Sequence, residues 1–423
     1  MNMRICTETF NKSNSASLST YIGLDGYKAW ENIVKNNIPR TEIISKIKDS
    51  GLRGKGGAGF STGLKWSFIP SASNQQKYLV CNSDESEPGT CKDRDILRYN
   101  PHSVIEGMLI ASYAIGASVA YNYLRGEFIK DQWKVFNQAL SDAYEKNLVG
   151  KNILESNINI DIHSLIGAGA YIVGEETAML ESIEGKRGMP RVKPPFPAIK
   201  GLYGKPTIIN NTETLSTVPK IILNGSDWYK NLGINSGEGI KIFSMSGHIS
   251  RPGNYEIPLG TPFKDLLEMA GGVANSKKLK AVIPGGSSVP VVTAEKILNT
   301  NMDYESLNKA GSMLGSGGVI VMDDSTCMVS VLQTISRFYF AESCGQCTPC
   351  REGTGWLYKI LSNIIIGKGT TNDLVQLERI AGMIEGNCIC ALGDAAALPV
   401  KSFLQNFWSE FEYFVEKKES MVS

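Results

Sequence analysis

This sequence of 423 residues has few histidines, a small net charge and few long hydrophobic runs. The three histidines, His102, His163 and His248, are far apart, and the formal net charge is only +1. A nearly neutral chain has no long-range field that would attract nucleic acid or an anionic membrane surface, so we expect no nucleic-acid partner. Because imidazole is a common metal ligand, so few histidines also argue against a histidine-based metal site.

Long apolar segments are nearly absent too. The segment from Met1 to Ser19 is polar and lacks the apolar run of a secretory signal. An uncharged stretch, Gly107 to Leu124, approaches the roughly 20 residues that span a bilayer, but it is interrupted by serine, asparagine and tyrosine. We therefore expect a buried helix that ends at Gly116, then a strand over residues 117–124, and no insertion into a membrane.

Cysteine, in contrast, is abundant, and its spacing indicates metal chemistry. Of the nine cysteines, Cys344, Cys347 and Cys350 follow one another at C-x2-C-x2-C spacing. Disulfide pairing would leave one of the three over, and zinc sites usually take two pairs of cysteines or histidines. Three close cysteines with a remote fourth are typical of a [4Fe–4S] cluster. The residues alone leave the fourth ligand open between Cys388 and Cys390, with zinc and inert thiols as the alternatives.

A glycine-rich stretch at residues 51–66 is a candidate ligand-binding loop. Its glycines expose consecutive backbone N–H groups and let a phosphate or a flat ring approach closely. Arg53, Lys55 and Lys65 add positive charge, which a plain flexible linker would not need. The stretch therefore predicts a site for a phosphate-bearing ligand.

The same loop contains a weak match to the dinucleotide-binding fingerprint. Gly54, Gly56 and Gly59 fit G-x-G-x-x-G. That fingerprint has to follow a strand, whereas residues 42–49 before the loop have the pattern of a helix. The match alone therefore does not indicate a standard dinucleotide fold.

The first half of the chain alternates between strand and helix patterns, as in an α/β fold. Strands are expected at residues 77–81, 117–124 and 158–163 and within 204–211, and helices at 129–146 and 177–183. An acidic turn at residues 82–90 directly follows the first strand, where α/β folds place groups that bind ligands. A second glycine loop, 167–174, leads into a helix N-terminus, which favours anions. The alternatives are a solvated turn and ordinary first-turn acids.

The second half of the chain changes character twice. A proline-rich segment at 188–197 has to be extended or turn-like rather than helical, and residues 233–239 are typical of a linker. Strands at 240–246, 253–258 and 281–283 with a helix at 262–270 predict a small β-rich module with a scaffold role. Helices at 327–340, 353–366, 371–384 and 395–416 would enclose the cysteines.

Taken in order, the motifs resemble one known family, the NADH-binding F subunit of bacterial respiratory complex I. They lie at residues 54–66, 82–97, 167–188, 342–353 and 390–394 and cover essentially the whole chain. The resemblance implies three parts. A Rossmann-like α/β flavin domain would occupy residues 1–232, a small ubiquitin-like β-grasp module 233–326, and an all-α helical bundle with the iron–sulfur cluster 327–423.

The resemblance also implies the site residues. The cofactor-binding set would be Gly54, Lys55, Gly56, Gly57, Lys65, Asn82, Asp84, Glu85, Tyr171, Gly174, Glu175, Glu176, Asn210, Asn211 and Thr214. NADH would further contact Phe60, Phe68, Glu87, Lys193 and Phe196. The cluster ligands would be Cys344, Cys347, Cys350 and Cys390, because the family ligand directly precedes Ala-Leu-Gly-Asp. Cys388 then remains an extra thiol, and Lys55 stands where the family usually has arginine.

The activity that the resemblance implies is hydride transfer from NADH to FMN, then one-electron transfer to the [4Fe–4S] cluster and onward towards quinone. We expect no protein nucleophile, and Glu175 and Glu176 would tune nucleotide binding. The partners would be a small [2Fe–2S] subunit and a large multi-cluster subunit, at the cytoplasmic face of the inner membrane. The alternatives are the diaphorase subunit of a soluble NAD-linked hydrogenase or formate dehydrogenase, and a flavin-free electron-transfer scaffold.

Overall fold

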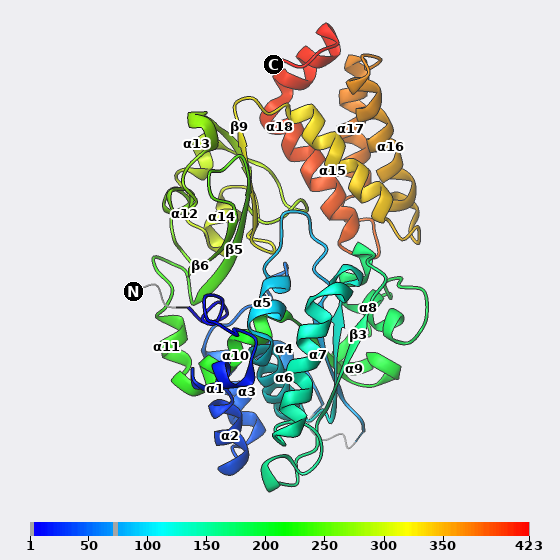
Figure 1. Ribbon diagram of the computed structural model, residues 1–423. Coiled ribbons are helices and arrows are strands. Elements are labelled where there is room, and N and C mark those ends of the chain that lie inside the picture. Colours follow the sequence, from blue (N-terminus) through cyan, green and yellow to red (C-terminus); the bar gives the residue numbers. More distant parts are fainter. Residues whose placement is uncertain (1–3, 71–74, 423) are drawn as a thin grey trace.

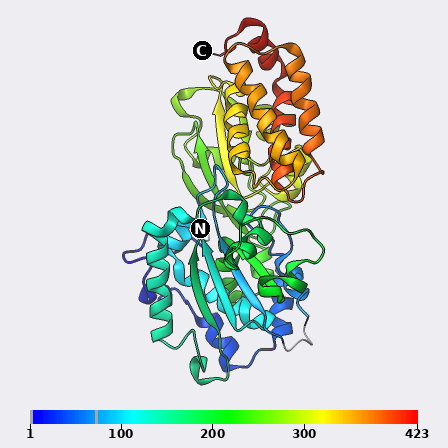
Figure 2. The same ribbon diagram turned by 90° about the vertical axis from the view of Figure 1, so that its right-hand side faces the viewer.

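The first 230 residues of the chain form the α/β unit, which is built around a parallel sheet of four strands. The structure is a computed structural model that describes residues 4–70 and 75–422 (Figure 1). The strands β1 (Tyr78–Ser83), β2 (Val119–Leu124), β3 (Asp161–Ile166) and β4 (Thr207–Asn211) lie in the order β3-β2-β1-β4. Neighbouring strands are parallel, so their carboxyl ends share one edge of the sheet (Figure 2).

Helices cover the sheet, as the crossovers of a parallel sheet require. The most buried is α6 (Pro101–Ile115), which ends at Gly116 in the left-handed conformation, with φ of 77°. The uncharged stretch is therefore the end of a helix followed by β2, as predicted. Within the described ranges, no helix is both long and apolar enough to cross a bilayer. The other helices of this unit are α1 (Leu18–Ile22), α2 (Lys28–Lys35), α3 (Arg40–Asp49), α4 (Thr62–Ser67), α5 (Asp93–Tyr99), α7 (Gln132–Glu145), α8 (Glu176–Ile183), α9 (Pro197–Lys200), α10 (Thr212–Asn224) and α11 (Ser226–Lys230).

The predicted strand at 158–163 is displaced in the structure, where β3 runs from Asp161 to Ile166. Ile160 instead pairs with Gly150 in an isolated antiparallel bridge. Its side chain is buried in the core from that position. The apolar residues before β3 thus belong to a turn that closes against the core, which their hydrophobicity could not distinguish from a strand.

The second unit, residues 240–323, is a mixed sheet of five strands in the order β6-β5-β9-β7-β8. β5 and β9 are parallel and the other pairs antiparallel. The sequence analysis missed β9, which is buried at almost every position and so shows no alternation. The elements are β5 (Ile240–Gly247), β6 (Gly253–Pro258), α12 (Phe263–Met269), β7 (Leu279–Ile283), β8 (Val292–Thr293), α13 (Ala294–Ile297), α14 (Tyr304–Lys309) and β9 (Gly318–Asp323).

The amino-terminal segment is fastened to this second unit. The carboxylate of Glu256 on β6 accepts hydrogen bonds from the backbone N–H groups of Ile5 and Cys6, at 3.1 and 2.8 Å. The N–H and hydroxyl of Thr7 also donate to it, at 2.9 and 2.7 Å. Ile5 and Cys6 are buried although the surrounding segment is polar. Met1 to Met3, with which the polar segment begins, lie outside the described residues.

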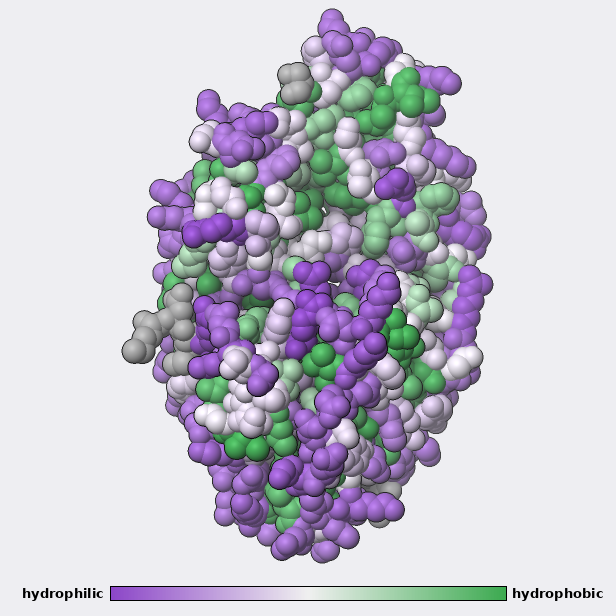
Figure 3. Space-filling view, in the orientation of Figure 1, coloured by the Kyte–Doolittle hydropathy of each residue, from purple (hydrophilic) through white to green (hydrophobic). Residues whose placement is uncertain are grey.

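Four long helices form the helical bundle, residues 328–417, as predicted. They are α15 (Met328–Glu342), α16 (Thr348–Ile365), α17 (Thr371–Ile384) and α18 (Leu392–Lys417). α16 begins at Thr348 rather than at residue 353, because Pro349 fits the first turn of a helix. On the face shown in Figure 3, hydrophilic residues predominate, and hydrophobic residues gather over the upper part of the molecule, where the bundle lies.

Candidate functional site

The glycine loop, residues 53–61, projects an open backbone from the end of α3. The N–H of Gly54 donates to the carbonyl of Phe60 at 2.8 Å, and the N–H of Lys55 donates to the Thr214 hydroxyl at 2.9 Å. Gly57 has φ of 145°, and a side chain there would meet no atom within 4 Å. The loop therefore has free space beside Gly57, which a ligand can enter.

Two of the four strands place polar side chains beside this loop. The Asn82 side chain, on β1, donates to the carbonyl of Gly174 at 2.9 Å, and Asn210, on β4, accepts from the Trp66 indole N–H at 2.8 Å. A Cβ on Gly56 would lie 3.0 Å from the Asn211 Cβ. The structure thus brings the predicted residues of β1 and β4 to one edge of the sheet, next to the glycine loop.

Asn211 also determines where α10 begins. Its side-chain oxygen accepts from the N–H of Glu213 at 3.0 Å and from that of Thr214 at 3.4 Å, which is the geometry of an N-cap. Thr214 in turn holds the loop through Lys55. The predicted residues Asn211 and Thr214 therefore support the loop as well as line the site.

Asp84 is a buried carboxylate whose bonding is incomplete. It is 8% exposed, and its Oδ2 has no hydrogen-bond partner in the described part of the chain. Burial raises the pKa of Asp84 to about 7. A Cβ on Gly174 would lie 3.5 Å from Oδ2, so the carboxylate faces a surface kept clear by glycine. An unpaired buried oxygen at this point fits a ligand that supplies hydroxyl donors, as the ribityl chain of FMN does.

Two other predicted acids are occupied within the protein. Glu85 accepts from the N–H groups of Asp93 and Arg94 at 2.8 and 3.0 Å, and so caps α5. Burial, with the charge of Asp93, raises the pKa of Glu85 to about 7. Glu87 accepts from the Tyr171 hydroxyl at 2.6 Å and has a further donor in the second unit. Both carboxylates therefore hold elements around the site together.

A half-open set of charges, the open cluster, lies at the start of α8. Its members are Lys65, Glu175, Glu176 and Lys193, which are between 17% and 29% exposed. Glu176 pairs with Lys65 at 2.9 Å and with Lys193 at 3.2 Å. Burial alone would raise the pKa of Glu176, but the two lysines outweigh it and lower that pKa.

Within the open cluster, Glu175 is the N-cap of α8 and accepts from the N–H groups of Thr177 and Ala178. Its first-turn role at the helix N-terminus, the alternative considered from the sequence, is therefore present. Lys193 adds an ion pair with Glu175 at 3.0 Å. The cluster keeps two ammonium groups at the site, where they can contact phosphates.

Aromatic side chains border the same region. Phe60 and Phe68 are each 48% exposed and lie 6.1 Å apart between ring centroids. Phe196, just before α9, is 58% exposed. Exposed rings of this kind can stack on a flat base. The structure therefore places the three predicted phenylalanines where stacking on a ligand is open to them.

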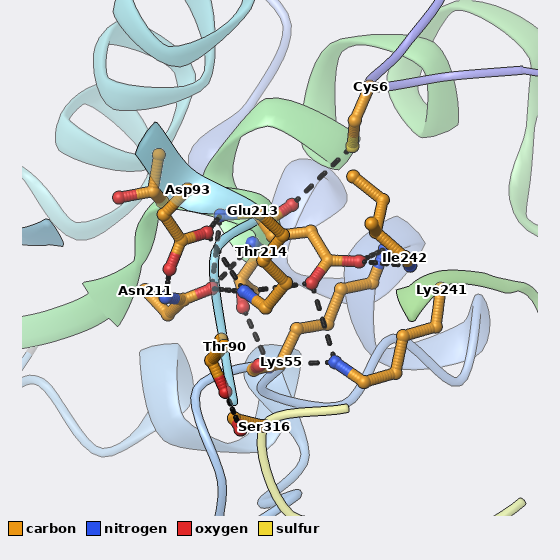
Figure 4. Close-up of polar contacts among 12 residues, drawn as sticks. Cys6, Lys55, Thr90, Asp93, Asn211, Glu213, Thr214, Lys241, Ile242 and Ser316 are labelled. Carbon is orange, nitrogen blue, oxygen red and sulfur yellow. Dashed lines mark hydrogen bonds and ion pairs between the residues drawn. The ribbon is translucent and has the colours of Figure 1, made fainter. Parts of the chain in front are cut away.

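Behind the glycine loop lies a second set of charges, which the sequence analysis missed. This buried cluster consists of Lys55, Lys92, Asp93, Glu213 and Lys241, and Figure 4 labels all of them except Lys92. Glu213 lies 3.6, 2.9 and 3.4 Å from the ammonium groups of the three lysines, and every member is at most 4% exposed. The ammonium of Lys55, predicted to face the ligand, is paired here, so only the backbone of Lys55 faces the loop. The sequence contained one sign of this cluster, because Lys241 is a charged residue within the apolar strand β5.

The cysteines gather at the foot of the bundle. Cys344 and Cys347 precede α16, Cys350 lies in its first turn, and Cys388 and Cys390 lie between α17 and α18. All five pack against one hydrophobic cluster. The N-termini of α16 and α18 favour the negative charge that thiolates bring to an iron–sulfur cluster. The sequence analysis predicted that this helix begins at residue 353. That start was wrong, and the difference matters for the site because Cys350 lies within the helix.

Burial raises the pKa of three of these thiols, including Cys350. Burial raises the pKa of Cys390 to about 12, and burial with the nearby Cys347 does the same for Cys388. No three His, Cys, Asp or Glu side chains in residues 4–70 and 75–422 converge closely enough to hold a single metal ion. A cubane cluster is wider than one ion and is held by thiolates around its periphery, so the donor set fits a cluster better than zinc.

The two candidate sites adjoin. The N–H of Tyr171 donates to the carboxylate of Glu342 at 2.9 Å, two residues before Cys344. The Tyr171 ring packs edge-on against Phe338 and Tyr339 of α15, at 5.1 and 6.0 Å between centroids. Tyr171 thus joins the ligand edge of the sheet to the helix that leads into the cysteines. Glu342 was not among the predicted residues.

Comparisons with known proteins agree with this geometry. Residues 47–220 match the Nuo51 FMN-binding domain, residues 242–292 the SLBB domain, and residues 330–414 the NADH-ubiquinone oxidoreductase-F iron-sulfur binding region. Fold and site together define a protein that binds FMN and a [4Fe–4S] cluster.

Similar whole proteins identify the family. The chain is 53% identical to the F subunit of the NADH-quinone oxidoreductase of Rickettsia bellii (strain OSU 85-389), over 88% of this chain and 89% of that protein. It is 50% identical to the F 2 subunit of the same enzyme in Rhizobium meliloti (strain 1021), over 95% of each. The chain belongs to the family of NADH-quinone oxidoreductase F subunits, as the sequence resemblance indicated. A solved NAD+-reducing [NiFe]-hydrogenase in the H2-reduced state is also similar, with a TM-score of 0.85, 32% identity, and coverage of 98% of this chain and 67% of that one.

Proposed function

We propose that this chain is the NADH-oxidising subunit of a respiratory NADH-quinone oxidoreductase. The observation that carries the proposal is the contact of Tyr171 with Glu342, which joins the ligand edge of the sheet to the cysteine loop. An enzyme that takes a hydride at one site and passes single electrons from another needs the two sites next to each other. When bound, FMN supplies this change from two electrons to one.

The residues that would hold FMN are those that the structure gathers around the glycine loop. The free N–H groups of the loop would contact the flavin, and Asp84 would accept from its hydroxyls. Asn82, Gly174, Asn210, Asn211 and Thr214 complete this proposed site. Tyr171 and the caps formed by Glu85 and Glu175 keep its elements in place. The chain's role is to hold, orient and shield the cofactor, with no nucleophile of its own.

The nucleotide would bind over the exposed aromatic rings and the open cluster. Phe60, Phe68 and Phe196 offer faces for the adenine, and Lys65 and Lys193 offer charge to the phosphates. Glu175 and Glu176 already occupy these lysines, so a phosphate has to compete with carboxylates. NADH and NAD+ carry the same phosphates, so this competition limits the affinity for both and eases release of the product.

Cys344, Cys347, Cys350 and Cys390 would hold the [4Fe–4S] cluster. The cluster would then lie between the N-termini of α16 and α18. Its ligand Cys390 lies close enough to Glu175 for the charge of that carboxylate to act on it. The three units would correspond to a Rossmann-like flavin domain at 1–232, a ubiquitin-like β-grasp module at 233–326 and the bundle at 327–423.

The subunit would work within a larger complex. A small [2Fe–2S] subunit and a large multi-cluster subunit are its proposed partners, at the cytoplasmic face of the inner membrane. Large hydrophobic side chains stay exposed on the bundle, which suits a protein partner. They include Trp356, Ile366, Val375 and Met383, each more than half exposed.

The test is an anaerobic titration with NADH of the chain reconstituted with FMN, iron and sulfide. Bleaching of the flavin band together with part of the broad cluster absorbance is the expected result. A chain that binds the cluster but no flavin, and gives no response to NADH, would instead be an electron-transfer scaffold.

A second candidate follows from the similarity to the NAD+-reducing hydrogenase, which covers 98% of this chain. In that case the same sites would serve a soluble complex. Co-purification distinguishes the two, because only the respiratory subunit would be recovered with membrane-bound partners and with quinone reduction by NADH.

A further inference from the structure

Two residues of the second unit hold consecutive carbonyl groups of the glycine loop. The ammonium of Lys241 on β5 donates to the carbonyl of Lys55 at 3.2 Å (Figure 4). The hydroxyl of Tyr304, the first residue of α14, donates to the carbonyl of Gly54 at 3.3 Å. The second unit, which the sequence indicated to be only a scaffold, thus reaches the candidate flavin site.

These contacts determine where the N–H groups of the loop point. In a planar trans peptide the C=O and N–H point in opposite directions. The peptide between Gly54 and Lys55 shows this, since its carbonyl accepts from Tyr304 while its N–H donates to Thr214 on the other side. The carbonyl of Lys55 accepts from Lys241, so the N–H of Gly56 points away from the second unit.

The N–H of Gly56 is the group left available. Within residues 4–70 and 75–422, neither it nor the N–H of Gly57 donates a hydrogen bond. Beside Gly57 there is open space. The loop therefore presents two unused donors, at Gly56 and Gly57.

Packing alone does not fix the loop in this orientation. A cavity of about 300 Å³ borders it, with Arg53, Lys55 and Tyr304 in its lining. Lys241 itself is fully buried and held by Glu213 at 3.4 Å. The orientation of the loop peptides thus depends on a few directed hydrogen bonds, two of which come from the second unit.

We propose that Lys241 and Tyr304 are positioning residues of the flavin site, which direct the N–H of Gly56 towards an acceptor oxygen of bound FMN. The inference rests on the FMN site proposed above. The second unit is then part of that site, although neither side chain touches the cofactor.

The test compares the dissociation constant of FMN among variants of the full-length apoprotein, measured by quenching of flavin fluorescence. Lys241→Met removes the donor at similar length, and affinity is expected to fall about ten-fold. Tyr304→Phe removes only a hydroxyl, and affinity is expected to fall about three-fold. In both variants the visible band of bound FMN shifts, because its hydrogen bond changes.

The matched control is Lys280→Met. Lys280 lies in the same unit, pairs with Glu410 at 2.7 Å and donates to the carbonyl of Thr326 at 2.6 Å, but it does not contact the loop. This variant is expected to lose stability and keep the affinity and the spectrum of bound FMN. Lys241→Arg, which retains a donor, is expected to restore most of the affinity that Lys241→Met loses.

The outcomes distinguish failure of the positioning role from failure of the proposed FMN site. If the wild-type chain binds FMN, and Lys241→Met and Tyr304→Phe bind it as tightly as Lys280→Met, the positioning role is overturned and the flavin site stands. If the wild-type chain binds no FMN, both fail. Should Lys241→Met not fold, Tyr304→Phe decides, since loss of one hydroxyl leaves the buried cluster intact.

Discussion

The buried cluster and the open cluster use the same chemistry on two sides of the glycine loop, yet they differ in how deeply their charges are buried. Glu213, at the centre of the buried cluster, is 1% exposed and surrounded by lysines. Glu176, at the centre of the open cluster, is 25% exposed and pairs with Lys65 and Lys193, of which Lys193 also pairs with Glu175. The charges of the first set are closed off from solvent, whereas the second can exchange a partner for a ligand.

The difference follows from the cost of desolvation. A buried charge that loses its partner is strongly destabilising, so the buried cluster has to stay paired. Partly exposed ion pairs contribute little to stability, so the members of the open cluster can be separated at small cost. Full burial of the charges thus marks support of the fold, and partial exposure marks contact with a ligand.

The largest expected effect extends this contrast to two cysteines. The Cys388 thiol lies near Cys347, but it donates to the carbonyl of Ile384 at 3.5 Å and packs against Gly393. Cys390→Ser is expected to lose most of the cluster iron after reconstitution, whereas Cys388→Ser keeps it. Iron and sulfide analysis with visible spectroscopy measures this. The reverse result would make Cys388 the fourth ligand.

Glu213→Gln tests the buried cluster. The substitution leaves three buried lysines with Asp93 as their remaining close carboxylate and is expected to cost about 3–5 kcal/mol of unfolding free energy. Urea denaturation measures it. Glu176→Gln in the open cluster is the control and is expected to cost no more than about 1 kcal/mol. Equal losses of unfolding free energy in the two variants would contradict the distinction between the buried and the open cluster.

The same residue predicts a pH dependence. Burial would raise the pKa of Glu213, but Lys241, Lys92 and Lys55 lower it to about 2, from an ordinary value of 4.5. Its stabilisation is therefore complete above pH 4.5 and is lost as the pH falls towards 2. Acid denaturation of the wild type and Glu213→Gln should converge over that range. A difference that persists at pH 2 would show that lost packing is responsible.

Asp84 is buried like the first cluster, but its Oδ2 has no hydrogen-bond partner among the described residues, and it predicts an opposite trend. Burial raises its pKa from 3.8 to about 7, so the apoprotein loses stability as the pH rises between these values. Asp84→Asn is expected to stabilise the apoprotein by about 2 kcal/mol at pH 8 and to weaken FMN binding. Melting curves at pH 5 and pH 8 measure the first effect. An Asn variant less stable than wild type at pH 8 would contradict it.

The smallest expected effect is on nucleotide binding in the open cluster. Glu176→Gln removes a carboxylate that competes with phosphates for Lys65 and Lys193. Affinity for NAD+ is expected to rise about three-fold, in keeping with the modest energy of half-exposed ion pairs. Product inhibition by NAD+ in the reconstituted chain measures it. Unchanged inhibition would remove the tuning role of Glu176.

The sequence predicted those features that depend on local pattern. The parallel strands β1 and β2, the helix that ends at Gly116 and the four helices of the bundle follow from periodicity and glycine caps. Strand β9 was missed because it is buried on both faces. The start of α16 was misplaced because Pro349 in a first turn is compatible with both a loop and a helix.

The residues of the candidate site also fall into those that a local pattern predicts and those that it does not. Residues that carry a motif, such as Asn82 and Asn211, do come together at one edge of the sheet. The partners that hold them could not be predicted, because Lys241 and Glu342 come from other units and no local pattern indicates a contact over that separation. For Lys55, the residue type suggested a ligand contact that its burial excludes.

The fastening of the amino terminus to Glu256 has a consequence for synthesis. Ile5 leaves the ribosome 251 residues before the carboxylate that accepts its N–H. At roughly 5–20 residues per second, the segment waits about 12–50 seconds for its partner. During that time the α/β unit can form its parallel sheet and cover Cys6, whose thiol lies 3.0 Å from the Ser216 hydroxyl of α10. The N–H groups of Ile5, Cys6 and Thr7 still lack their acceptor. This segment thus completes its hydrogen bonds only after the α/β unit that follows it has been made.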